Sequence, residues 1–149
     1  MIIKYLIYLA LQLKGRHVFR KKVGILENSF VLNPKNVTIG DFCGINHGVF
    51  IVEHHRIEIS SYVVLSARCM LIDARLDKSK FKTNESPKHV CGPIKIADGA
   101  WIETGAIILA NVTVGKKAIV GAGAVMTRDL PAYAIVAGNP AQIIEQIYG

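Results

Sequence analysis

The histidines are the side chains of this 149-residue chain best suited to proton transfer near neutral pH. His54 and His55 are adjacent and directly follow Glu53, whereas His89 ends a long polar segment. A neutral imidazole within hydrogen-bond reach of a hydroxyl can remove its proton as the oxygen attacks an electrophile. We therefore rank His54, then His89, then His55 as candidates for a general base.

The cysteines and histidines do not form the pattern of a metal site. Cys43, Cys69 and Cys91 are widely spaced, with no CxxC pair and no Cys/His cluster at the spacing of zinc ligands. No metal is predicted, and thiols with no evident partner favour a reducing compartment.

An aliphatic residue returns at every sixth position between residues 96 and 126, and a second, mostly small residue follows each by four positions. Helices repeat near 3.6 residues and half-buried strands near 2, so neither explains a period of six. A six-residue unit can be one short strand and a turn, and three units make a triangular coil. Because a single coil cannot bury its inner face, coils stack and align their aliphatic residues in columns. The period therefore predicts a β-solenoid.

The same period runs from residue 37 to residue 71, with one interruption. At "EHHRIE" the next aliphatic residue arrives after eight positions, which places at least one ring of His54 and His55 outward at a corner. From 73 to 93 the period disappears, and the segment is polar with two prolines, so we expect an extruded loop. The end of the chain is predicted to form a closing coil and a short C-terminal helix. The solenoid domain is predicted to span 23–149.

Residues 1–22 combine an apolar helical pattern with a basic end. We expect a helix that caps the solenoid or lies on a membrane surface, and the two roles are compatible. The net charge of +7 favours anionic partners. Nucleic acid is not predicted, because aromatic residues make up only 7% of the chain and no nucleic-acid-binding signature occurs.

The stretch "GAWIETGAIILANVTVGKKAIVGAGAVMTRDLPAYAIVAGNPA" resembles the carboxy-terminal coils of the hexapeptide-repeat acyltransferases. The similarity extends from about Val37 to the end and is greatest to the sugar O- and N-acetyltransferases of polysaccharide and O-antigen synthesis. The resemblance implies an all-β, left-handed parallel β-helix, an exception to the usual right-handed crossover. It also implies a homotrimer with active sites between subunits and acetyl-CoA as the donor.

The resemblance carries donor-site roles to five positions. Trp101 occupies the position beside the pantetheine arm of coenzyme A, and Thr104 and Ala122 lie where the family lines that arm with small or hydroxyl residues. Thr127 and Arg128 match a threonine and a basic residue that meet the adenosine end, where a cation suits the phosphates.

One departure concerns the 3′-phosphate of the donor. Gln142 stands where relatives often carry Arg or Lys. The 3′-phosphate could then depend on Arg128, Lys116 or Lys117.

The acceptor side departs from the family at its most informative position. Asn46 matches an asparagine that contacts the acceptor, and Glu53 lies where relatives often carry an acceptor-binding aspartate. The family's catalytic histidine, however, is absent from the matching segment 73–76. Besides the three histidines above, Asp73 or Glu53 could act as the base if its pKa is raised, and an amine acceptor would need no strong base.

The leading prediction is a cytoplasmic, acetyl-CoA-dependent transferase that acts on a sugar, a nucleotide-sugar or a lipid-linked glycan, with peripheral contact at the inner membrane face as an open alternative. A catalytically degenerate solenoid that binds a partner or serves as a scaffold is the second reading, favoured by the missing histidine. The zinc carbonic anhydrase built on this fold is disfavoured, because no third histidine accompanies His54 or His89 at ligand spacing.

Overall fold

A computed structural model of the chain describes residues 23–77, 79, 86 and 88–147. The expected helix at 1–22 lies outside the described residues. Within the described part, no helix is long and apolar enough to cross a membrane.

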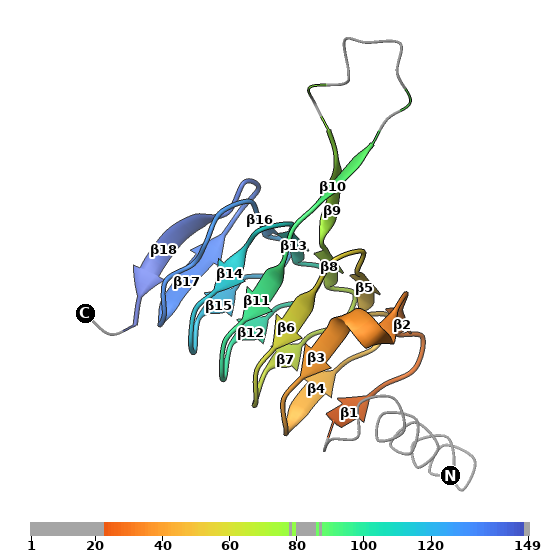
Figure 1. Cartoon of the computed structure of the whole chain (residues 1–149). Coiled ribbons are helices and arrows are strands. Elements are labelled where there is room, and N and C mark those ends of the chain that lie inside the picture. Colours follow the sequence, from red (N-terminus) through yellow and green to blue (C-terminus); the bar gives the residue numbers. More distant parts are fainter. Residues whose placement is uncertain (1–22, 78, 80–85, 87, 148–149) are drawn as a thin grey trace, which may run out of the picture.

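Three parallel sheets run along the molecule and form the walls of a triangular coil (Figure 1). Sheet A contains β1 (Val23–Ile25), β4 (Cys43–Ile45), β7 (Val64–Leu65), β12 (Trp101–Ile102), β15 (Ile119–Val120), β17 (Ala134–Ala137) and β18 (Gln142–Gln146). Sheet B contains β2 (Phe30–Val31), β5 (Phe50–Val52), β8 (Met70–Ile72), β13 (Ile107–Leu109) and β16 (Val125–Met126). Sheet C contains β3 (Val37–Ile39), β6 (Ile57–Ile59), β11 (Ile94–Ile96) and β14 (Thr113–Val114).

The chain visits sheets A, B and C in turn, so each coil pairs with the coil before it. This is the left-handed parallel β-helix that the resemblance implies. We call the edges where the chain passes from one sheet to the next the AB, BC and CA corners. A short 3₁₀ helix, η1 (Pro34–Asn36), lies at the BC corner of the first coil.

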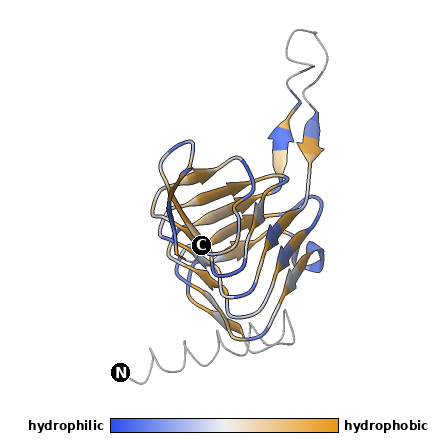
Figure 2. Ribbon diagram, turned by 90° about the vertical axis from the view of Figure 1, so that its left-hand side faces the viewer, coloured by the Kyte–Doolittle hydropathy of each residue, from blue (hydrophilic) through white to orange (hydrophobic). Residues whose placement is uncertain are grey.

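The residues with a period of six point into the interior, as predicted. Ile51, Leu71 and Ile108 lie in register on neighbouring strands of sheet B, and each is fully buried. Burial of each such side chain contributes about 1.5–3 kcal/mol. Small residues such as Ala106 and Ala124 are also fully buried, where the wall bends toward a corner. Figure 2 shows the result as apolar strands joined by hydrophilic corners.

Glycines at the CA corner let successive coils approach closely. A Cβ atom added to Gly115 would lie 2.4 Å from the backbone nitrogen of Ala132. At Gly40 it would lie 2.5 Å from the nitrogen of Ser61. Since any side chain would push the backbones apart, these positions require glycine.

The chain leaves the stack between β8 and β11, within the segment 73–93 that was expected to be extruded. Its base is an antiparallel ladder of β9 (Ala74–Leu76) and β10 (His89–Cys91), which pair with each other and not with the three sheets (Figure 1). The sequence did not predict this ladder. The ladder fixes the place of His89, which pairs with Leu76.

The prediction of a short C-terminal helix is wrong. Residues 142–146 form β18, which pairs antiparallel with β17. The segment "QIIEQ" contains two β-branched isoleucines, which favour a strand. In addition, β17 is the last parallel strand of sheet A, so its outer edge would be unpaired without β18. Strand β18 pairs with that edge.

Candidate active site

The BC corner gathers most of the titratable residues singled out in the sequence. It is formed by residues 53–56, 73–77, 88–93 and 127–129 of different coils, and the hairpin of β9 and β10 emerges from it. Because the coils stack in register, residues about twenty apart in sequence become neighbours along this edge.

Asp73 is the buried anchor of this corner. Its side chain is fully buried, and its Oδ1 and Oδ2 accept the backbone N–H groups of His54 (2.8 Å) and His55 (2.7 Å). The same Oδ1 lies 3.6 Å from Nδ1 of the His54 ring. A carboxylate has about four lone-pair positions, so it can serve both backbone groups and still attract the imidazole.

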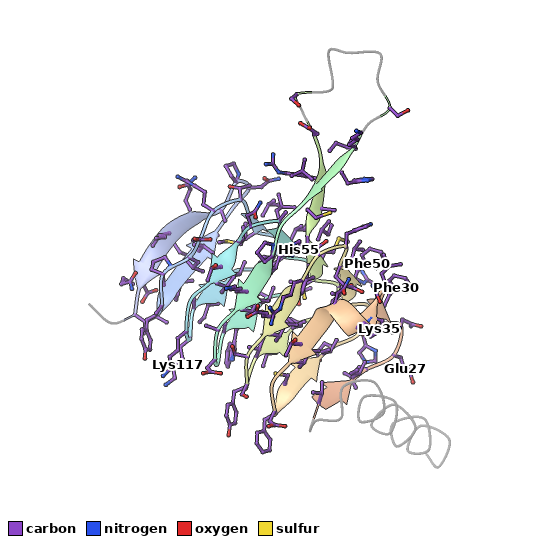
Figure 3. All side chains as sticks on the ribbon, in the orientation of Figure 1. Glu27, Phe30, Lys35, Phe50, His55 and Lys117 are labelled. Carbon is purple, nitrogen blue, oxygen red and sulfur yellow. The ribbon has the colours of Figure 1, made fainter. Side chains whose placement is uncertain are left out.

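The rings of His54 and His89 stack on each other. Their centroids are 5.8 Å apart and the planes differ by 16°. Both side chains are exposed. His54 comes from a corner of the wall and His89 is the first residue of β10, so the hairpin brings together two candidates that are 35 positions apart in sequence. His55 also lies at this corner and is exposed (Figure 3).

Glu53 lies beneath this pair and is 1% exposed. Its Oε1 accepts the backbone N–H of Asn33, while its buried Oε2 has no hydrogen-bond partner among the described residues. Burial raises the pKa of Glu53 to about 7, and the nearby charge of Asp73 adds to the increase. Glu53 is therefore a buried carboxyl that can be protonated at neutral pH.

Thr127 and Arg128 lie on the same corner, farther along the stack, and both are exposed. Arg128 Nη2 donates to Oε1 of Gln142 at 3.3 Å, so the residue that departs from the family pattern contacts the predicted phosphate ligand. A hollow of about 340 Å³ is lined by Arg128, Asp129 and Gln142, among others. It could hold a charged group of a ligand.

Three other predicted residues lie on the AB corner, at the opposite edge of sheet B. Thr104 and Ala122 are exposed there on successive coils, linked by a hydrogen bond from Gly123 N to Thr104 O of 2.9 Å. Asn46 is half-buried, and its Nδ2 donates to the carbonyl of Leu65 at 3.0 Å. Within one chain, the width of sheet B therefore separates these residues from the BC corner.

Trp101 begins β12 on the outer face of sheet A and is 49% exposed. It lines a hollow of about 360 Å³ together with Tyr62, Gly99, Lys117 and Ile119. Sequence reasoning missed Tyr62 entirely. The available signal was an aromatic residue directly after "SS", at the same turn position as Phe42 in the preceding coil.

The described residues contain no group of three or more His, Cys, Asp or Glu side chains arranged to hold a metal ion. The three cysteines are free, and burial raises the pKa of Cys69 to about 12, which keeps that thiol unreactive.

Comparisons with known proteins agree with the repeat and the fold. Residues 93–128 match the family "Bacterial transferase hexapeptide (six repeats)". A Saccharomyces cerevisiae protein named as a candidate acetyltransferase is 27% identical over 90% of this chain and 71% of its own length. A similarly named Schizosaccharomyces pombe protein is 35% identical over 75% of this chain and 54% of its own length. The 2,3,4,5-tetrahydropyridine-2,6-dicarboxylate N-acetyltransferase of Staphylococcus aureus is 54% identical over 54 residues, or 36% of this chain and 23% of that protein. The chain thus spans about half of the second relative and less than a quarter of the third.

Solved structures share the fold over most of the chain. A hexapeptide-repeat acetyltransferase of Vibrio cholerae, in complex with acetyl coenzyme A, has a TM-score of 0.76 and 26% identity over 90% of this chain and 74% of its own. A maltose O-acetyltransferase of Clostridium difficile has a TM-score of 0.79 and 27% identity over 90% of this chain and 73% of its own.

The repeat and the three-sheet coil define a left-handed β-helix of the hexapeptide type. Together with the named relatives, they show that the chain is similar to the hexapeptide-repeat acyltransferases.

Proposed function

We propose that the protein transfers an acetyl group from acetyl-CoA to a hydroxyl or amine of a sugar, a nucleotide-sugar or a lipid-linked glycan, in the synthesis of a surface polysaccharide. The observation that carries the proposal is the stack of His54 and His89 over the buried Asp73. Two solved neighbours support the donor and the sugar class: one is in complex with acetyl coenzyme A, and the other is a maltose O-acetyltransferase.

His54 acts as the general base in this proposal. Because its Nδ1 lies toward Asp73, Nε2 is the nitrogen available to the acceptor. Nε2 takes the proton of the acceptor hydroxyl as the oxygen attacks the thioester carbonyl, and the thiolate of coenzyme A leaves with the electron pair of the C–S bond. That thiolate then receives a proton from the imidazolium. Asp73 is a positioning residue, and His89, stacked on His54, is the second candidate for the base.

The donor extends along the stack in this proposal. Arg128, with Thr127 beside it, meets the phosphates, where a guanidinium can form paired hydrogen bonds. Trp101, Thr104 and Ala122 contact the pantetheine arm. On the acceptor side, Asn46 binds the sugar. The structure does not favour the predicted acceptor-binding role of Glu53, because its carboxyl is buried and its Oε1 already accepts the backbone N–H of Asn33.

A homotrimer would bring the separated residues together across subunit boundaries. The outer face of sheet B supports this assembly, because the outward residues that lie in register on its five strands are all apolar. They are Phe30, Phe50, Met70, Ile107 and Val125. The rings of Phe30 and Phe50 stack at 5.1 Å, and 45% and 38% of these side chains are exposed (Figure 3). An exposed apolar face of this kind is typical of a protein interface. It lies between the BC and AB corners, so a neighbour packed there borders both sets of residues.

The proposed location is the cytoplasm, with peripheral contact at the inner membrane face through residues 1–22. The free cysteines support a reducing compartment. The net charge of +7 suits an anionic surface.

Calorimetric titration with acetyl-CoA tests the donor assignment. We expect micromolar binding by the intact chain and weaker binding by Arg128→Ala, with Lys95→Ala on the outer face of sheet C as the control. A screen of sugar and nucleotide-sugar acceptors then tests transfer. Absence of binding at millimolar acetyl-CoA would leave the degenerate solenoid as the better description.

A further inference from the structure

The CA corner carries a column of outward residues that is separate from the BC corner. At the same turn position, successive coils place Phe42, Tyr62, Gly99, Lys117 and Tyr133, each with a positive φ between 52° and 68°. Backbone hydrogen bonds of 2.9–3.0 Å join each of these turns to the one before it, for example Gly99 N to Ser61 O and Lys117 N to Asp98 O. The side chains are therefore spaced by one strand separation, about 4.8 Å.

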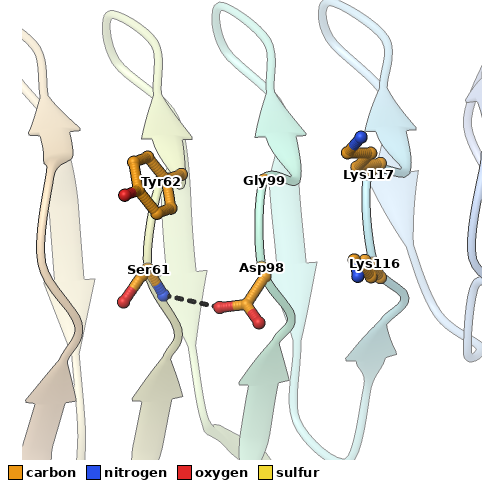
Figure 4. Close-up of a pocket in the computed structure, with 6 residues that line it drawn as sticks. All are labelled: Ser61, Tyr62, Asp98, Gly99, Lys116 and Lys117. Atoms are coloured by element: carbon orange, nitrogen blue, oxygen red, sulfur yellow. Dashed lines mark hydrogen bonds between the residues drawn. The ribbon is translucent and has the colours of Figure 1, made fainter.

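Gly99 interrupts this column. The other four coils place a large side chain at the position, whereas Gly99 leaves a notch between Tyr62 and Lys117 (Figure 4). The backbone permits a side chain there, since Phe42 and Tyr62 adopt the same positive φ. A Cβ atom added to Gly99 would lie 3.2 Å from Cγ of Lys117, so the lysine stem leans over the notch. The notch joins two hollows of about 480 and 360 Å³, which share Tyr62, Gly99 and Lys117 as lining residues.

One wall of the notch is the aromatic ring of Tyr62. The rings of Phe42 and Tyr62 stack with centroids 5.2 Å apart and planes 16° apart. Phe42 covers one face of Tyr62, and the other face points along the column to the Gly99 coil. A planar ring at the height of Gly99 would lie about 4.8 Å from Tyr62. That distance falls in the range of about 4.5–7 Å at which aromatic rings stack.

The opposite wall is cationic. Lys117 lies one coil beyond Gly99, and Lys116 lines the same hollow (Figure 4). Asp98 also lines it, but its Oδ1 accepts the backbone N–H of Ser61 at 2.9 Å, and the two lysines outweigh its charge. A bound ring would therefore have Tyr62 on one face, a cation on the other, and ammonium groups within reach of an attached anion.

We propose that this notch is a binding site for a nucleoside phosphate, with the base inserted between Tyr62 and Lys117 and the phosphate held by Lys116 and Lys117. Stacking accepts any base, because every base has a π face. The ligand could be supplied by the nucleotide of a nucleotide-sugar acceptor, or by the adenosine end of the acyl donor if that end is not held by Arg128. The site lies at the CA corner, and sheet C separates it from the His54 cluster at the BC corner. Its occupancy therefore does not depend on the proposed transfer reaction.

Trp101 provides the readout, because it is the single tryptophan of the chain and lines the smaller of the two hollows, together with Tyr62, Gly99 and Lys117. We would titrate the full chain with adenosine 3′,5′-bisphosphate, with UDP and with inorganic pyrophosphate, and follow Trp101 fluorescence and binding heat. Adenosine 3′,5′-bisphosphate lacks the pantetheine arm, so its quenching of Trp101 reports this hollow. Tighter binding of that nucleotide than of UDP would identify the donor as the source, and the reverse would identify the acceptor.

The variants use asparagine, which tolerates a positive φ better than most residues. Tyr62→Asn and Gly99→Asn should each weaken nucleotide binding by roughly tenfold or more, the first by removing the ring and the second by filling the notch. Lys117→Asn should weaken it as well. Tyr133→Asn, the same change at the same turn one coil beyond Lys117, should bind like the unmodified chain.

Two further variants separate this proposal from the transferase proposal. Arg128→Ala and His54→Gln should retain nucleotide-dependent quenching of Trp101 even where donor binding or transfer is lost. Three results would each overturn the notch as a nucleoside site. They are no quenching by either nucleotide at millimolar concentration, equal affinity for pyrophosphate and the nucleotides, and unchanged binding by both Tyr62→Asn and Gly99→Asn.

Discussion

Asp73 holds both the backbone and the ring of His54. Its Oδ1 accepts the His54 backbone N–H at 2.8 Å and lies 3.6 Å from Nδ1 of the ring. Its Oδ2 accepts the neighbouring N–H of His55. The carboxylate therefore sets both the path of the corner backbone and the orientation of the proposed base.

Replacement of Asp73 by asparagine should damage both stability and catalysis. An amide presents one acceptor oxygen and two N–H donors, so one of the two buried backbone N–H groups loses its acceptor. An unsatisfied buried group costs about 1–3 kcal/mol, which thermal unfolding would detect. In steady-state kinetics we expect kcat to fall while KM for the donor stays unchanged. A rise in KM alone would show that Asp73 does not position the base.

The two stacked histidines should differ in their effect on transfer. His54→Gln should lower kcat by about a hundredfold or more, because general-base catalysis typically contributes about 10²–10⁴. His55→Gln is the matched control at the adjacent position and should retain activity, with rates measured on the acceptor found in the screen. If His89→Gln is the more severe of the variants, the roles of the two stacked rings are exchanged.

Glu53 should make the folded state less stable as the pH rises. Its pKa is about 7 in the folded chain, compared with 4.5 as the ordinary value. Between these values the folded state binds more protons than the unfolded state, so the free energy of unfolding falls with increasing pH and levels off above pH 7. Glu53→Gln removes this titration. Its melting temperature relative to the parent chain should increase from pH 4 to pH 8; a constant difference would contradict the raised pKa.

Gly115 should be intolerant of any side chain. A Cβ atom would lie 2.4–2.8 Å from backbone atoms of Pro131 and Ala132, and backbone cannot move aside as a flexible side chain can. Overpacking of this kind costs about 1–3 kcal/mol, so Gly115→Ala should melt several degrees lower. Gly44 is the control, because a Cβ atom there meets nothing within 4 Å. Equal melting temperatures for the two variants would refute the close packing of coils at this corner.

The outer face of sheet B should be the subunit interface. The parent chain is expected to have three times the mass of one 16.3 kDa chain in light scattering. Phe50→Asp places a charge in the centre of the apolar column and should yield monomers, because an unpaired buried charge strongly opposes association. Lys95→Asp, on the outer face of sheet C, should remain trimeric. Monomeric parent protein would eliminate this assembly.

The sequence determined the architecture because the solenoid has a local code. Each coil repeats the same period, so the inward positions of Ile51, Leu71 and Ile108 could be predicted from spacing alone, and all three are buried. The prediction of a helix at the end of the chain is wrong because β18 owes its conformation to pairing with the edge of β17, a partner that the local sequence does not reveal.

The candidate site was decided by the tertiary structure. His54, Asp73 and His89 share no local pattern, and they meet only because one turn of the coil and one hairpin bring residues 19 and 35 positions apart to the same corner. The notch beside Tyr62 has the same origin, since a glycine becomes a gap only when its neighbours on other coils carry side chains. A repeat fixes which residues face inward. The chemistry on its corners depends on the register between coils and on the insertions, which are long-range properties of the folded chain.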